Sequence, residues 1–279
     1  MNLKTMKLYS QVERIHNELR ALGLDGEKPL KVSDLTPFDQ YHYFGTAAVD
    51  EAARALGVGR ESRVLEIGSG IGGPARHLAA TTHCHVVALE IQQDLHDTAA
   101  ALTRRCGLDR TVQHVRGDVL GELPHWEPFD AITSFLVFLH IADLTRLFEA
   151  CRRLLKDDGG MFIEDFVLLA PPSDAQLADL QHKVACPDLR DRATYEDALR
   201  RAGFVLESVT DMSRRWQEFT TQRAAAFRAD RGRFAALHGN DITDGLNDFY
   251  TTVADLFSTE VLGGVRIHAR PNRRDEGAA

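Results

Sequence analysis

The chain has 279 residues, 44% of them hydrophobic and 27% charged, which is the composition of an ordinary soluble globular protein with a sizeable core. No apolar run approaches the roughly 20 residues that a membrane span requires, and a formal net charge of -8 disfavours binding along a nucleic-acid backbone. The four cysteines are widely spaced and form no CxxC pair, so we expect reduced thiols, no metal site and a cytoplasmic location.

Two segments precede the first predicted strand. Residues 4–24 have the spacing of an amphipathic helix, and residues 36–45 bring together four aromatic side chains and a histidine. The opening lysines are not followed by an apolar stretch, so a secretory signal is not expected. We therefore expect residues 1–45 to form an N-terminal helical cap with an aromatic segment.

From about residue 62, β-branched apolar runs alternate with longer helical patterns, which is typical of βαβ units around a parallel sheet. The candidate strands are residues 63–67, 85–90, 112–117, 131–137 and 161–166. Helical patterns cover residues 74–81, 92–106 and 144–155, and a glycine pair at 159–160 is expected to end the last of them. These elements predict an α/β, Rossmann-like fold with helices on both faces of the sheet.

The C-terminal third contains two more candidate strands. We expect a helix over residues 195–202, capped by Thr194 and stopped by Gly203, then a strand over 204–212 and a final edge strand over 264–270. The long interval between these strands carries helical spacing at 216–231 and 242–257, which predicts a helical insertion at about residues 214–262. The main domain is expected to span residues 46–271, and residues 272–279 to be a disordered tail.

Residues 63–73 describe a buried strand that runs into a glycine-rich turn and a helix. The spacing Gly68-x-Gly70-x-x-Gly73 satisfies the dinucleotide-binding fingerprint. Glu66 near the end of the apolar strand is unusual, because a buried carboxylate needs a partner. Glu90 and Asp118 follow the next two strands, and the carboxyl ends of parallel strands meet at one edge. An acidic pocket at that edge suits a cationic cofactor and repels a pyrophosphate.

These residues resemble motifs I, II and III of the class I S-adenosylmethionine (SAM) methyltransferases, in order and at the family's spacing, over residues 62–168. The resemblance implies a seven-stranded, mostly parallel sheet whose last strand is antiparallel, with SAM as methyl donor and S-adenosylhomocysteine (SAH) as product. It implies that Glu66 holds the amino-acid end of SAM, Glu90 the ribose, and Asp118 with Val119 the adenine. The other expected cofactor residues are Gln40, Gly68, Ser69, Gly70, Ile91, Gly117 and Phe135.

The segment around His140 is similar to the Leu-His-Ile-x-Asp stretch of phosphoethanolamine N-methyltransferases. That similarity implies a catalytic His140 working with an N-terminal tyrosine, Tyr41 or Tyr43, in an aromatic segment that closes over the cofactor as a lid. A general base helps an amine or phenol lose its proton. The tyrosine could equally give a cation–π contact to a cationic acceptor. A structural or cofactor-contact role for His140 remains the alternative.

The late helical insertion resembles that of sarcosine/dimethylglycine N-methyltransferases. Its arginines either bind an acceptor carboxylate or phosphate, or form a solvated helical face. We expect direct SN2 methyl transfer to a small molecule, foremost an amine nitrogen, by a monomer or homodimer without nucleic-acid or membrane partners. The alternatives are O- or C-methylation of a natural-product or quinone-like acceptor, and a non-catalytic SAM-binding protein.

Overall fold

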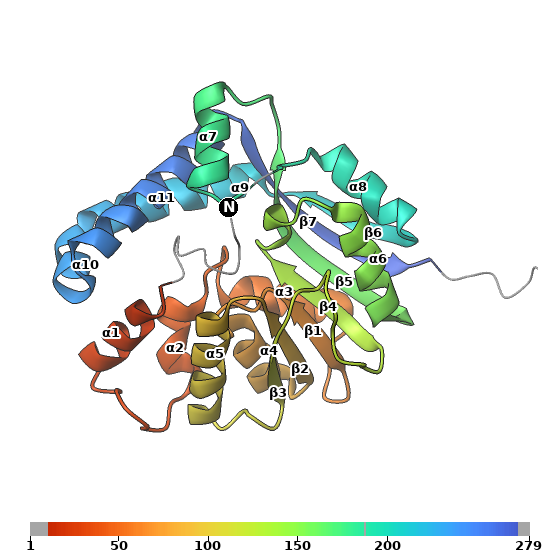
Figure 1. Ribbon diagram of the computed structural model, residues 1–279, viewed down its shortest axis with the longest axis horizontal. Helices are drawn as coiled ribbons and strands as arrows, with labels where there is room; N and C mark the ends of the chain where they lie inside the picture. The colour runs from red at the N-terminus through yellow and green to blue at the C-terminus, as the bar shows by residue number, and fades with distance from the viewer. Residues whose placement is uncertain (1–10, 187, 273–279) are drawn as a thin grey trace, which may run out of the picture.

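The computed structural model describes residues 11–186 and 188–272. A seven-stranded sheet with the order β3-β2-β1-β4-β5-β7-β6 forms its centre (Figure 1). Strands β1 to β5 run parallel, and β7 is antiparallel to both of its neighbours. The predicted α/β fold with a mostly parallel sheet is therefore confirmed. The strands are β1 (Arg63–Ile67), β2 (His85–Glu90), β3 (Val112–Arg116), β4 (Phe129–Phe135), β5 (Leu155–Leu168), β6 (Phe204–Asp211) and β7 (Leu262–Pro271).

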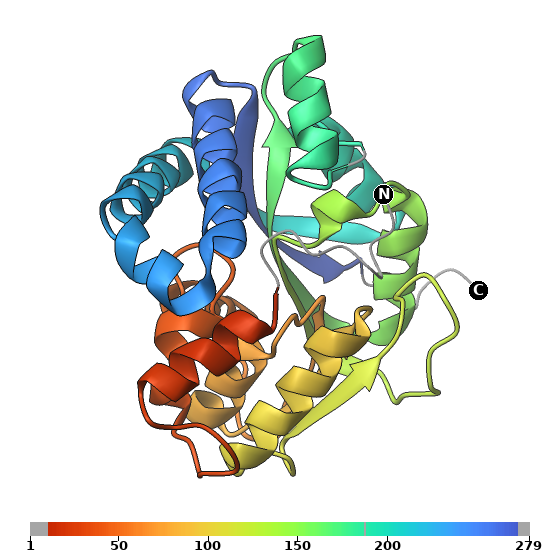
Figure 2. The same cartoon turned by 60° about the vertical axis from the view of Figure 1, so that its left-hand side comes forward.

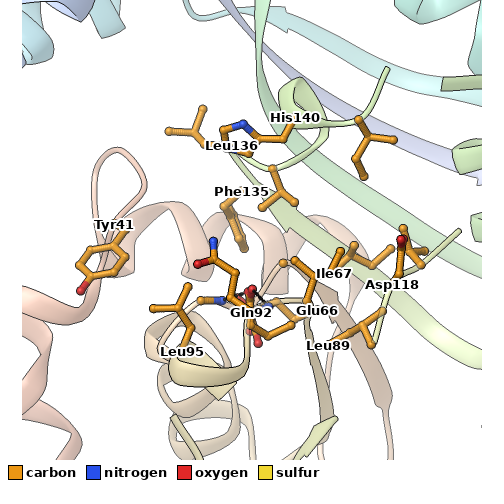
Figure 3. Close-up of a pocket in the computed structure, with 18 of the residues that line it drawn as sticks. Tyr41, Glu66, Ile67, Leu89, Gln92, Leu95, Asp118, Phe135, Leu136 and His140 are labelled. Carbon is orange, nitrogen blue, oxygen red and sulfur yellow. Dashed lines mark hydrogen bonds between the residues drawn. The ribbon is translucent and has the colours of Figure 1, made fainter. Parts of the chain in front are cut away.

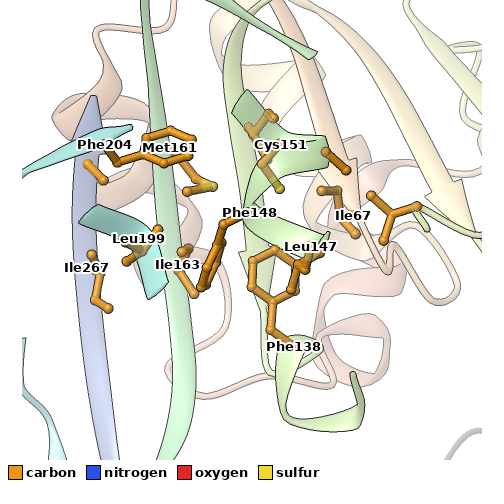
Figure 4. Close-up of a cluster of buried hydrophobic side chains, with 14 of the residues drawn as sticks. Ile67, Phe138, Leu147, Phe148, Cys151, Met161, Ile163, Leu199, Phe204 and Ile267 are labelled. Atoms are coloured by element: carbon orange, nitrogen blue, oxygen red, sulfur yellow. The ribbon is translucent and has the colours of Figure 1, made fainter. Parts of the chain in front are cut away.

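Helices cover both faces of the sheet, as expected for parallel strands that are buried on both sides. One apolar cluster joins the sheet to α6 (Leu144–Leu154) and α8 (Arg192–Arg201), and Figure 4 shows its centre around Phe148 and Ile163. A second cluster joins the opposite face to α3 (Thr46–Leu56) and α4 (Gly73–Thr82). The helix α5 (Gln93–Arg105) packs beside β2 and β3.

The predicted final edge strand is wrong in one respect. The strand β7 is antiparallel as expected, but it lies between β5 and β6, so β6 is the edge. Burial agrees with this order: most β7 side chains are buried, whereas most β6 residues are exposed, including Val205 at 46%. An edge strand tolerates that exposure, and an interior strand does not.

Two predicted element boundaries are also wrong. The glycine pair does not end α6, because β5 already begins at Leu155 and carries both glycines. A Cβ at Gly160 would lie 2.8 Å from Leu56 Cδ2, so a larger residue there would require the Leu56 side chain to shift where the strand passes under α3. The N-cap of α8 is Asp191, whose carboxylate accepts the Thr194 N–H at 2.7 Å; Thr194 itself lies inside the helix. Gly203 follows the end of α8 with φ of 85°, as predicted.

The cap and the insertion come from opposite ends of the chain. The cap contains α1 (Glu13–Ala21) and α2 (Val32–Asp39), while residues 4–10 of the predicted helix lie outside the described residues. The insertion contains α9 (Ser213–Ala229), α10 (Arg231–His238) and α11 (Asn240–Ser258). Figure 2 shows α10 meeting α1 beyond the strand ends. The sequence did not predict α3 or α7 (Asp174–His182), and all of the expected tail except Asn272 is undescribed. No helix in the described ranges has the length and apolar character of a membrane span.

Candidate active site

The glycine turn after β1 requires its glycines. Gly68 has φ of 73°, and a Cβ there would lie 2.4 Å from Val137 Cγ1. A Cβ at Gly73 would lie 2.3 Å from the carbonyl oxygen of Asp39, so the end of α2 rests directly on the start of α4. The turn thus places backbone N–H groups at the strand ends and admits the cap against them.

Glu90 at the end of β2 braces this turn. Its Oε2 accepts the Gly70 N–H at 2.8 Å, and its Oε1 accepts the Gln92 N–H at 2.8 Å. Burial raises the pKa of the Glu90 carboxyl, and these backbone hydrogen bonds offset part of the rise. A carboxylate oxygen has two lone pairs, so each oxygen keeps the capacity to accept a ligand hydroxyl.

Glu66 is only 3% exposed, and its Oε2 has no hydrogen-bond partner among the described residues. Burial raises the pKa of this carboxyl to about 8, although the Arg76 guanidinium counteracts part of the effect. Two nearby polar atoms, Ser69 Oγ and Gln92 Oε1, also lack partners within the described part of the chain. A ligand that brings hydrogen-bond donors and a positive charge would satisfy this group of acceptors.

Asp118 follows β3, where its Oδ1 accepts the Leu120 N–H at 2.9 Å and fixes a tight turn. Its neighbour Val119 is buried, and Leu95 from α5 supplies an apolar surface opposite. A flat apolar ring with polar edges fits between such residues.

These groups line a cavity of about 430 Å³, which we call the first cavity. No lysine or arginine among the described residues lines this cavity, but five acidic residues do: Asp39, Glu66, Glu90, Asp118 and Asp143. The structure brings all expected site residues to this wall except Gln40 and Tyr43. Gln40 instead donates to Asp39 Oδ1 at 2.8 Å and lines the neighbouring cavity.

His140 lies on a short 3₁₀ helix, Phe138–His140, after β4. Its Nδ1 is 2.8 Å from the carbonyl oxygen of Ala185, which can only accept, so the neutral ring carries its proton on Nδ1 and a lone pair on Nε2. Burial lowers the pKa of His140, and the carbonyl partly restores it. The buried Asp165 holds the 3₁₀ helix, because its Oδ2 accepts the Leu139 N–H at 2.9 Å.

A second cavity of about 320 Å³ adjoins the first beneath the cap and the insertion. The two cavities share Tyr41, His42, Leu136 and His140 in their walls. Leu136 has φ of 57°, a left-handed conformation rare for a branched side chain, and such strain concentrates at functional sites. His140 is thus at the border where two bound molecules would meet.

The two candidate tyrosines differ in position. Figure 3 shows the Tyr41 ring directed away from His140, whereas Tyr43 is buried among aromatic rings and lines only the second cavity. Burial raises the pKa of each hydroxyl to about 12. Both hydroxyls therefore remain protonated near neutral pH and act as hydrogen-bonding groups.

Sequence reasoning did not select two buried residues of the aromatic segment. Asp39 pairs with Arg76 on α4 at 3.0 Å, with both side chains 0% exposed. The ring centroids of His42 and Phe135 lie 4.8 Å apart, and burial lowers the pKa of His42 to about 4. The run of polar side chains from Asp39 to His42 was the available signal, because a segment that only packed the cap against the sheet would not need them.

Comparison with known proteins gives the family. A family model described as a methyltransferase domain matches residues 40–209, more than half of the chain. A glycine/sarcosine/dimethylglycine N-methyltransferase from Actinopolyspora halophila is 27% identical over 179 residues, 64% of this chain and 32% of the relative. A sterol 24-C-methyltransferase from Debaryomyces hansenii is 25% identical over 169 residues, 58% of this chain and 44% of the relative. The matches thus span less than half the length of these relatives.

A solved structure shares the fold over most of this chain. Phosphoethanolamine N-methyltransferase 2 from Haemonchus contortus, in complex with phosphomonomethylethanolamine and SAH, superposes with a TM-score of 0.75 and 19% identity. The superposition covers 92% of this chain and 60% of that one. The resemblance that the sequence motifs indicated is confirmed. Because the family model covers more than half of its length, this chain belongs to the methyltransferase domain family.

Proposed function

We propose that this chain is a SAM-dependent methyltransferase that methylates a small molecule at an amine nitrogen. The observation that carries the proposal is the buried Glu66, whose Oε2 has no partner among the described residues and which lines an acidic cavity beside the glycine turn. A sulfonium and an ammonium group suit that cavity, while the phosphates of a dinucleotide do not. Relatives that are N-methyltransferases support the choice of nitrogen.

The first cavity offers a contact for each part of SAM. Glu66 would hold the ammonium group, and Glu90 the ribose hydroxyls through its remaining lone pairs. Asp118 and Val119 would bind the adenine edge and face. Phe135, stacked on His42, forms the wall towards the second cavity.

The second cavity would hold the acceptor against this site. When bound, SAM supplies a methyl group on a sulfonium, so that an amine lone pair forms the new N–C bond while the C–S electrons return to sulfur. His140 lines both cavities and is neutral near pH 7, so its Nε2 lone pair would take the proton that the amine loses. Most of the rate enhancement would come from orientation and exclusion of water.

The cap would act as the lid over this site. In this division of the chain, residues 1–45 would be the lid and residues 46–271 the methyltransferase domain. Within that domain, residues 214–262 would close the acceptor cavity. The buried Asp39–Arg76 pair would fix the base of this lid on α4. Of the four cysteines, three are buried and all are free thiols, which supports a cytoplasmic location.

Carbon methylation is the second candidate, because several relatives are sterol C-methyltransferases and the second cavity is largely apolar. A carbon nucleophile is an alkene or enolate, not an amine lone pair. The position of the transferred methyl group therefore separates the two candidates.

The experiment is methyl transfer from isotope-labelled SAM to a panel of amines, phenols, thiols and alkenes, with products identified by mass spectrometry. The proposal expects labelled N-methyl product in the amine group. Label on carbon alone would favour the second candidate. If SAM binds but no member of a broad panel is methylated, the non-catalytic alternative gains and the proposed activity is wrong.

A further inference from the structure

The second cavity differs from the first in the sign of its charges. Its ionised side chains are three arginines and one carboxylate: Arg14, Arg223, Arg233 and Glu18. Two adjoining cavities of opposite charge favour two different bound molecules. A cationic cofactor suits the first, and an anionic group is favoured in the second.

Arg223 on α9 has no acidic neighbour that compensates its charge within the described residues. Arg233 pairs with Glu18 at 3.6 Å and with Asp230 at 2.7 Å. Within residues 11–186 and 188–272, no acidic side chain forms an ion pair with Arg223, and its Nε is buried without a hydrogen-bond partner. A partly desolvated guanidinium without a counter-charge is costly unless a ligand supplies one.

Aromatic rings already enclose this guanidinium. Its Cζ lies 4.8 Å from the Tyr43 ring centroid, 5.3 Å from Phe219 and 4.5 Å from Tyr250. The expected cation–π contact of Tyr43 is therefore made by the chain's own arginine. A cationic acceptor would have to displace Arg223 from these rings, so the enclosure favours an acceptor that brings an anion.

The remaining wall is apolar and the space is large. Apolar side chains come from the cap, from β5 and its surroundings, and from the insertion: Ile15, Phe38, Leu139, Phe166, Val184 and Phe249. A volume of about 320 Å³ lies at the lower end of the roughly 300–1,000 Å³ typical of sites for drug-sized ligands. A two-carbon amino acid would leave most of this apolar surface uncovered.

We propose that the acceptor is an amine with an aromatic or branched apolar body and a single carboxylate, which Arg223 binds. A planar guanidinium matches a carboxylate through paired N–H donors. The amine lies at the border with the first cavity, beside His140. This inference rests on the proposed methyl transfer and narrows its substrate to a class unlike free glycine.

The test is a binding measurement that needs no turnover. Isothermal titration uses the full chain saturated with SAH, and the probes are 4-(aminomethyl)benzoate, 4-methylbenzylamine and glycine. 4-(Aminomethyl)benzoate should bind at least about tenfold more tightly than 4-methylbenzylamine, which lacks the carboxylate, and than glycine, which lacks the apolar body. Arg223→Met should remove the preference over 4-methylbenzylamine, while Arg228→Met, on an exposed position of the same helix, should keep it.

The outcomes separate the two levels of the proposal. A protein that does not bind SAH contradicts the proposed function. One that binds SAH but prefers 4-methylbenzylamine or glycine, or binds none of the probes, contradicts this inference alone. Retention of the preference over 4-methylbenzylamine in Arg223→Met would also overturn it. Since the probe comparison is made on the unaltered chain, the inference is testable even if Arg223→Met does not fold.

Discussion

Replacing Glu66 with glutamine should raise the unfolding free energy of the ligand-free protein and, at the same time, weaken SAH binding. Burial holds the folded-state pKa of Glu66 at about 8, above the ordinary value of 4.5. The folded state therefore binds more protons than the unfolded state between these values. The neutral Glu66 carboxyl contributes fully to the stability of the folded protein below pH 4.5, and this contribution is lost as pH rises towards 8.

The magnitude follows from that shift. Between pH 4.5 and pH 7 the loss amounts to about 3 kcal/mol, at about 1.4 kcal/mol per pH unit, and a glutamine that never ionises avoids it. At pH 7 a carboxyl with a pKa of about 8 is about nine-tenths protonated. An ammonium ligand requires the ionised form, so SAH binding at pH 7 should release about nine-tenths of a proton.

Two assays measure these effects. Titration calorimetry with SAH at pH 7 in buffers of different ionisation enthalpy counts the released protons, and urea unfolding compares stabilities. Glu66→Gln should abolish the proton release, weaken SAH binding about tenfold or more, and raise the unfolding free energy. Glu61→Gln, at an exposed position before β1, should change neither. Unchanged proton release in Glu66→Gln, or no release in the unaltered chain, would refute this role.

Three further substitutions follow from the same structure. Gly68→Ala should abolish SAH binding, measured by calorimetry, because its Cβ would overlap Val137 and because φ is positive. Asp39→Asn should lower the unfolding free energy by about 3–5 kcal/mol, since it leaves the fully buried Arg76 without its partner. His140→Ala should lower kcat at pH 7 while the Kd for SAH stays the same. In the unaltered chain kcat should fall only as pH drops below the ordinary histidine range, because burial lowers the pKa of His140.

Each of these substitutions has a matched control. Gly59→Ala should be tolerated, because nothing lies within 4 Å of the added Cβ. Asp50→Asn removes an exposed partner of His77 and should cost less than about 1 kcal/mol. His125→Ala changes an exposed histidine and should keep full turnover. Full turnover in His140→Ala, or near-normal stability in Asp39→Asn, would contradict the corresponding role.

The sequence predicted what depends on local pattern. The strands β1 and β2 were predicted at their observed bounds, because short β-branched runs between helices and glycines leave little choice. The carboxylates at successive strand ends were found for the same reason. Strand order was less predictable: β7 lies inside the sheet because it pairs with β5 on one side and β6 on the other, and no local sequence period records such long-range pairing.

The acceptor side was least predictable, because its contacts join distant segments. Tyr43 meets Arg223 only when the cap and the insertion fold together, 180 positions apart in sequence. The pairing of Asp39 with Arg76 likewise depends on how α2 docks against α4. A charged residue on a helical pattern is most often solvent-exposed, so neither arginine could be distinguished from its neighbours by sequence alone.

Titration of the purified chain with SAH and, separately, with NAD tests the central claim most directly. The acidic first cavity with its unpartnered Glu66 predicts binding of one SAH per chain and no measurable binding of NAD, whose pyrophosphate the carboxylates repel. Binding of NAD without binding of SAH would contradict the account.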